Sequence, residues 1–269
     1  MITDTSLDRN ENLVVNNISF SGFARYNGVN FIGDKYKVSF TINKDQSVSI
    51  KSKKYKSAGK ITIYLRRFPI LRTFAWFIET PVLFLLFIFM ISVDITIRAE
   101  RESSFLSENY QRPVMIIIVL LLIASLAFII RSIWEAKKIR KFHGAEHKTI
   151  YAAENNINLE LDNVRKCPRV SERCGTNFAV FFVCITVILF IARIYLNVLD
   201  FISVIFIISF LLANELFKIK DGESKPILKY FYSIGFWVQQ NLGTTEPTDA
   251  QLLASISAMN ELIELENNG

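Results

Sequence analysis

Four apolar stretches constrain the fold of this chain most, because each approaches the length of a membrane-crossing helix. A helical span needs about 20 mostly apolar residues. The stretches cover about residues 74–97, 113–134, 178–196 and 198–217. A mean hydropathy of +0.30 agrees with this pattern. The sequence therefore predicts an α-helical integral membrane protein with about four transmembrane helices, of which the last two form a tight hairpin.

Lysine and arginine predict how these spans are oriented. Both residue types are concentrated before the first span, between the second and third spans, and after the fourth. Such segments stay on the cytosolic side of a membrane. We therefore expect a multi-pass protein of the cytoplasmic membrane with both termini in the cytosol. The net charge of +6 then reflects this flanking bias and attraction to anionic lipid, so membrane lipid is the expected partner and nucleic acid is not.

The chain before the first span has a different pattern. Residues 1–14 are polar and acidic, which predicts a disordered tail without a cleavable signal peptide. Residues 15–65 contain short β-branched and aromatic runs, which are separated by turn-like sequences such as Asn27-Gly28. This alternation predicts a small antiparallel β module on the cytosolic face. The module either covers a functional site as a scaffold or contacts a partner or lipid.

The pattern of the region after the four-span domain of residues 66–218 predicts two further helices. Residues 226–242 are aromatic and amphipathic, which suits a helix in the membrane interface or packed below the bundle. The next helix, through about Glu264, carries a broad apolar stripe. This stripe either packs against the β module or forms a contact in a homo-oligomer.

Both histidines of the chain lie in one short motif within the cytosolic segment 131–177. His143 and His147 are separated by three residues, and Glu146 directly precedes the second histidine. Positions i and i+4 share one helix face, so both imidazoles can bind one metal ion. The H-x-x-E-H order is also the inverted zinc-hydrolase motif, in which the glutamate is the general base. The sequence predicts a site for zinc or another divalent transition metal at His143 and His147, with Glu146 as the catalytic residue.

Three residues are candidates for a third metal ligand, in the order Glu215, Cys174 and Glu79. Glu215 and Glu79 are carboxylates within apolar stretches, where a charge needs a functional or structural explanation. Each is alternatively an interfacial carboxylate paired with an arginine. Cys174 follows Arg173 in a loop before the third span, and is either a ligand or a reactive thiol.

Two motifs carry a resemblance to a known family. They are residues 142–149, FHGAEHKT, and residues 173–178, RCGTNF; weaker matches are residues 68–72 with Glu79, and residues 244–249. The chain resembles the YqhQ-like family of bacterial membrane proteins. The resemblance implies a bacterial protein of unassigned function that is described as a predicted metal-dependent enzyme.

Two classes of function remain open from the sequence. The first is a membrane-embedded, metal-dependent hydrolase with its site at the cytosolic face. The second is a membrane scaffold or transport subunit, in which the His and Glu residues hold a structural metal or a hydrogen-bonded joint. An open coordination position favours catalysis, and a closed four-ligand site favours structure.

Overall fold

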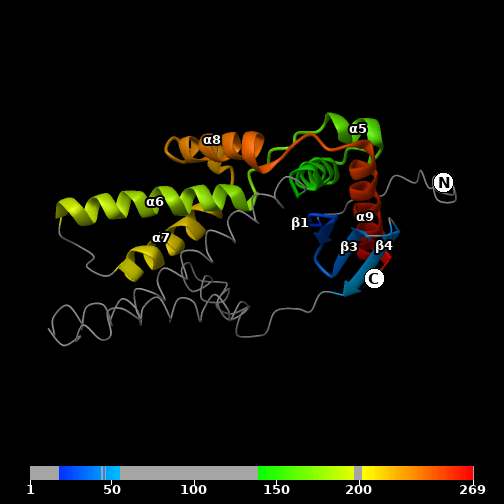
Figure 1. The fold of residues 1–269 in the computed structure, drawn as a ribbon, viewed down its shortest axis with the longest axis horizontal. Helices are drawn as coiled ribbons and strands as arrows, with labels where there is room; N and C mark the ends of the chain where they lie inside the picture. The colour runs from blue at the N-terminus through cyan, green and yellow to red at the C-terminus, as the bar shows by residue number, and fades with distance from the viewer. Residues whose placement is uncertain (1–17, 44, 46, 55–138, 197–201, 269) are drawn as a thin grey trace. The chain divides into compact units, whose positions relative to one another are not determined.

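The computed structural model describes residues 18–43, 45, 47–54, 139–196 and 202–268 (Figure 1). The chain forms two compact units. Three segments make up unit 1, and two make up unit 2. Unit 1 comprises Met1–Ser57, Trp134–Ser171 and Gln239–Gly269, and unit 2 comprises Ala58–Ile133 and Glu172–Val238.

Unit 1 contains a four-stranded antiparallel sheet with the strands in chain order. The strands are β1 (Ser21–Arg25), β2 (Gly28–Ile32), β3 (Tyr36–Ile42) and β4 (Val48–Lys54). Only two residues connect β1 to β2, whose closing pair is Arg25 and Gly28. The antiparallel strands predicted from the alternating pattern are therefore present.

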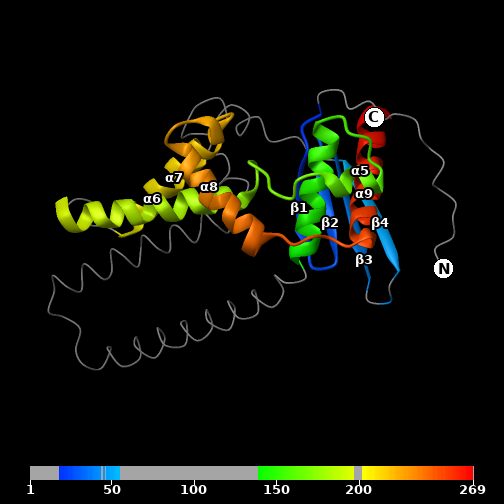
Figure 2. The ribbon, with the colours of Figure 1, turned by 90° about the horizontal axis from the view of Figure 1, so that it is seen from above.

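One face of this sheet is covered by α9 (Asp249–Asn268), as Figure 2 shows. Alternate residues of β2 and β3 point to this face, because successive side chains in a strand point to opposite faces. The resulting core contains buried residues of both partners: Val29, Phe31, Val38 and Phe40 from the sheet, and Ala258, Met259, Leu262 and Ile263 from α9. Of the two partners left open for the C-terminal apolar stripe, the structure shows the β module.

The turn between β2 and β3 is held by a carboxylate from α9. Oε1 of Glu266 accepts hydrogen bonds from the backbone N–H groups of Lys35 and Tyr36, at 2.8 and 2.7 Å. Glu266 is buried, so these bonds satisfy a charge that would otherwise be costly to desolvate. This contact connects residues that are about 230 positions apart.

Unit 2 contains α6 (Gly175–Leu196), α7 (Ile202–Phe217), the short helix η1 (Gly222–Ser224) and α8 (Leu228–Val238). Aromatic side chains join α6 to α7, with Phe178 and Phe210 ring centroids 5.3 Å apart. The core of this unit contains buried residues from three helices: Phe181, Ile185, Ala213, Leu228 and Tyr232.

The predicted fold class of about four transmembrane helices is wrong. Among the described residues, only Gly175–Tyr195 forms a helix long and apolar enough to cross a membrane. The 16 residues of α7 rise only about 24 Å, less than the bilayer core of about 30 Å. The first two expected spans, 74–97 and 113–134, lie outside the described residues. One such helix gives only weak support for a membrane location, and a multi-pass location is not supported.

Candidate metal centre

The histidine motif lies on a helix over residues 139–154 of unit 1. Phe142 and Ala153 of this helix are buried in the same core as the sheet and α9. The helix ends before Asn156, whose φ of 54° is the left-handed conformation that terminates helices. The spacing of four residues places His143 and His147 on one face, with ring centroids 4.4 Å apart.

Backbone carbonyl groups fix the tautomers of both histidines. Nδ1 of His143 lies 3.0 Å from the carbonyl oxygen of Gly243, and Nδ1 of His147 lies 2.7 Å from that of Arg169. A carbonyl oxygen only accepts hydrogen bonds, so each Nδ1 carries the proton. In a neutral imidazole, Nε2 then keeps its lone pair, which is the state a metal ligand requires.

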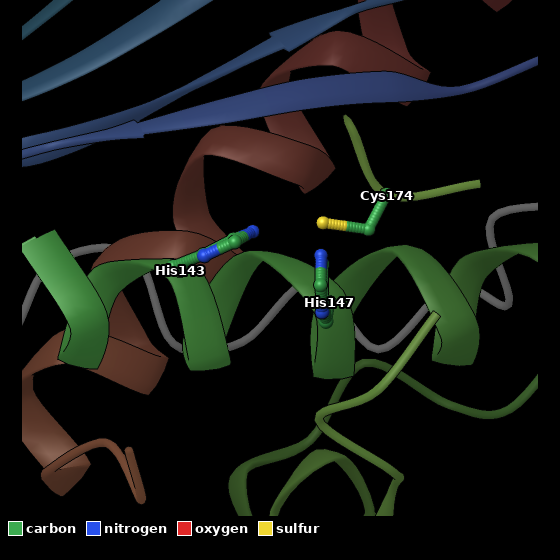
Figure 3. Close-up of side chains that lie close together, drawn as sticks. All are labelled: His143, His147 and Cys174. Carbon is green, nitrogen blue, oxygen red and sulfur yellow. The ribbon is translucent and has the colours of Figure 1, made fainter. Parts of the chain in front are cut away.

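A cysteine completes a group with the chemistry of metal ligands. Side-chain ligand atoms of His143, His147 and Cys174 all lie within 4.8 Å of one another. Figure 3 shows both imidazole rings directing a nitrogen toward the Cys174 sulfur. Glu215, on α7, is not a member of this group. Glu79 lies outside the described residues.

Glu146 is buried beside the histidines rather than grouped with them as a ligand. Its side chain packs against β1, where the N–H of Ala24 donates a hydrogen bond to the carboxyl group. Oε2 is buried and has no hydrogen-bond partner among the described residues. Burial raises the pKa of Glu146 to about 7, although the positive charge that His143 can carry lowers it. Glu146 can therefore exist in either protonation state near neutral pH.

Two glycines let backbone segments approach this site. A Cβ on Gly22 of β1 would lie 3.0 Å from both Cγ and Oε1 of Glu146. A Cβ on Gly144 would clash with the carbonyl oxygen of Thr245. The first glycine allows β1 to cover Glu146, and the second allows the segment before α9 to lie against the motif helix.

A buried lysine supports the loop that holds His147. Lys148 Nζ donates to the carbonyl oxygen of Arg165 at 2.6 Å and pairs with Glu246 Oε1 at 2.7 Å. The second oxygen of Glu246 lies 3.7 Å from Nη1 of Arg169, whose carbonyl group accepts from His147. This network connects Glu246 to the short loop after α5 (Leu161–Lys166).

Sequence reasoning missed these supporting contacts. The acceptors for His143 and His147 are main-chain oxygens, which any residue type supplies, so no side-chain pattern reveals them. The position of β1 over Glu146 depends on packing between distant segments. The only available signal is a glycine at position 22 inside a strand-like run, which indicates a close approach of another group.

The site and its surroundings thus define a candidate metal-binding protein with a buried carboxyl group. Comparison of the sequence with known protein families assigns the chain to one family. Residues 37–265 match the family described as "Protein of unknown function (DUF1385)". The match covers most of the chain, so the chain belongs to this family.

A curated relative supports the same assignment. The chain is similar to the uncharacterized protein YqhQ of Bacillus subtilis (strain 168), with 33% identity over 137 residues. The alignment covers 48% of this chain and 42% of that protein, so the chain spans less than half of its relative. No solved structure matches the chain. The predicted membership of a YqhQ-like family is confirmed, whereas the description of the family as metal-dependent enzymes stays a prediction.

Proposed function

We propose that this protein is a metal-dependent hydrolase that binds zinc, or another divalent transition metal, through His143 and His147. One observation carries the proposal. Both imidazoles donate Nδ1–H to backbone carbonyl groups, which leaves two Nε2 lone pairs on one helix face. Metal-binding histidines commonly have such a partner on their second nitrogen, because it fixes the tautomer and the ring orientation.

Cys174 is the third ligand in this proposal. Two imidazole nitrogens and one thiolate suit zinc, whose catalytic sites keep three protein ligands and an open fourth position. The short distances between the three ligand atoms support Cys174 over Glu215, which lies outside the group. A bound zinc ion supplies a Lewis acid and lowers the pKa of water to near neutrality.

Glu146 is the general base in the proposed reaction. It directly precedes a ligand, and it is not itself in the ligand group. Its Oε2 is buried and has no hydrogen-bond partner in the part of the chain that the structure describes. A general base must accept a proton from the attacking water and does not need to bind the metal. The hydrogen bond from Ala24 holds the carboxyl group in place while the second oxygen remains available.

A structural joint is the alternative, and one observation favours it. The two histidines connect the motif helix to Gly243 and Arg169, which are 100 and 22 residues away from them in sequence. Such bonds stabilise unit 1 whether or not the protein catalyses a reaction. In that case the histidines matter for stability and Glu146 contributes little to function.

Complementation of a deletion strain separates the two functions. Glu146→Gln keeps the shape of the side chain but cannot act as a base. A hydrolase should lose cellular function in this variant while keeping its abundance and metal content. Glu160→Gln, the same change at an exposed position, is the matched control and should complement fully. Full complementation by Glu146→Gln at normal abundance would refute the hydrolase.

The protein is also proposed to be attached to the bacterial cytoplasmic membrane through α6. This helix is long and apolar enough to cross a bilayer, and only 11% of its most apolar window is buried. Protease protection of an epitope in intact and lysed spheroplasts, together with carbonate extraction, tests the attachment. Release of the protein by carbonate would contradict it.

A further inference from the structure

One face of α8 packs against α6 and fixes how α8 is rotated. The ring of Phe231 stacks on Phe181, with centroids 5.3 Å apart. The ring of Tyr232 meets Phe181 edge-on at 5.2 Å. Leu228 and Tyr232 are buried in the same cluster. The rotation of α8 therefore leaves the residues on its opposite face directed outward.

The opposite face is an apolar and aromatic stripe. Its members recur at intervals of three and four residues, which places them along one side of a helix. They are Tyr230, Ile234 and Trp237 of α8, which are 65%, 48% and 60% exposed, and Ile227, in the turn directly before α8, which is 72% exposed. Large exposed apolar patches on a protein commonly mark contact surfaces. We refer to these four residues as the α8 stripe.

The composition of the α8 stripe matches a lipid surface. Tyr and Trp are enriched where a bilayer meets water, because each has an apolar ring and a polar atom. Lysines accompany the stripe: Nζ of Lys229 lies 5.1 Å from the Tyr230 ring centroid. From residue 218 to residue 238 the chain carries four lysines and two carboxylates, Asp221 and Glu223. This positive excess complements anionic lipid headgroups.

The helix beneath α8 provides an independent argument for lipid. Along α6 the exposed large residues are also apolar, namely Val183, Val187, Ile188, Ile191, Ile194 and Tyr195. Because α6 has the length and composition of a membrane span, its exposed surface suits acyl chains. The α8 stripe belongs to the same unit and lies on a helix packed directly against α6.

We propose that the α8 stripe is a membrane-contact surface that binds an anionic lipid bilayer. The apolar side chains enter the boundary between headgroups and acyl chains, and the neighbouring lysines bind the headgroups. This inference rests on the proposed attachment of α6 to the membrane, but it does not depend on the metal site, because all of its residues belong to unit 2.

Fluorescence of Trp237 tests the proposal in the full-length protein. Trp76→Phe and Trp134→Phe together leave Trp237 as the single tryptophan of the chain. The protein is reconstituted into phosphatidylglycerol–phosphatidylethanolamine vesicles, with or without brominated acyl chains. Bromine quenches only nearby indoles, so Trp237 should lose most of its emission in brominated vesicles and be protected from aqueous iodide. Replacing phosphatidylglycerol by phosphatidylcholine should weaken the quenching.

Two substitutions serve as test and control for the quenching of Trp237, and two quenching results would contradict the proposal. Ile234→Asp, in the stripe, should reduce quenching by brominated lipid, whereas Leu253→Asp, at an exposed apolar position of α9 in unit 1, should not. Quenching of Trp237 by iodide but not by bromine would show that the stripe faces water. Protection from both quenchers would show that protein covers it, for example a second copy of the chain. Either result overturns the proposal.

Discussion

The buried carboxyl group of Glu146 makes a quantitative prediction about stability and pH. Its pKa is raised from 4.5 to about 7 in the folded protein, mainly because burial disfavours the charged form. The folded state therefore binds this proton more tightly than the unfolded state does. Stability from Glu146 is fully present below pH 4.5 and is lost as pH rises through about 7.

The size of this effect on the free energy of unfolding follows from the shift in the pKa of Glu146. One pKa unit corresponds to about 1.4 kcal/mol, so a shift of about 2.5 units corresponds to roughly 3 kcal/mol. Glu146→Gln carries no charge at any pH and keeps an oxygen that can accept from Ala24. The variant should therefore exceed the wild type in free energy of unfolding by about 3 kcal/mol at pH 8, and this difference should shrink toward zero near pH 4.5.

Urea unfolding of chelator-treated protein, measured at several pH values between 4.5 and 8.5, provides the assay. Glu160→Gln, at an exposed position, should follow the wild-type curve. If the free energy of unfolding changes with pH equally in the wild type and Glu146→Gln, the reasoning is refuted. The carboxyl group would then have the same pKa in the folded and unfolded states.

Three further predictions, each tested by thermal unfolding, concern the packing around the site and at the β2–β3 turn. Gly22→Val places a branched side chain against the Glu146 carboxyl group and should destabilise the protein by about 1–3 kcal/mol; unchanged stability would contradict the close approach. Glu266→Ala removes the acceptor for two backbone N–H groups and should lower stability by about 2–4 kcal/mol, and a loss below about 0.5 kcal/mol would show that the turn does not need it. Lys148→Met should lower stability more than Glu246→Gln, because Lys148 is buried and also binds a carbonyl group, whereas Glu246 is more than half exposed; the reverse order would contradict the network.

Local patterns in the sequence predict much of unit 1. Alternating residues and the Asn27-Gly28 turn predict the strands, since period and turn chemistry are local properties. The stripe of α9 predicts that it covers an apolar face, which proves to be the sheet. The spacing of His143 and His147 predicts that the two rings share one side of a helix.

Features that depend on distant contacts could not be read from the sequence. Hydropathy reports composition but not the limits of a helix. A fourth membrane span was therefore predicted where the structure has α7, which contains only 16 residues. Hydropathy also cannot rank third ligands, because the ranking depends on which segment meets the motif helix. Cys174 lies near the histidines, whereas Glu215 was placed first from its sequence context alone. Burial of Lys148 is likewise invisible, because charged residues are buried mainly where a partner compensates them.

Cobalt binding tests the central claim, a metal site made by His143, His147 and Cys174, most directly. Chelator-treated protein is titrated with Co²⁺ while its visible spectrum and its metal content are measured. We expect one ion per chain, with intense tetrahedral d–d bands and a thiolate charge-transfer band. Cys174→Ser should lose the charge-transfer band, and His147→Ala should lose most of the bound metal. Wild-type protein that binds no Co²⁺ and no Zn²⁺, or that binds them equally well after His147→Ala, would contradict the account.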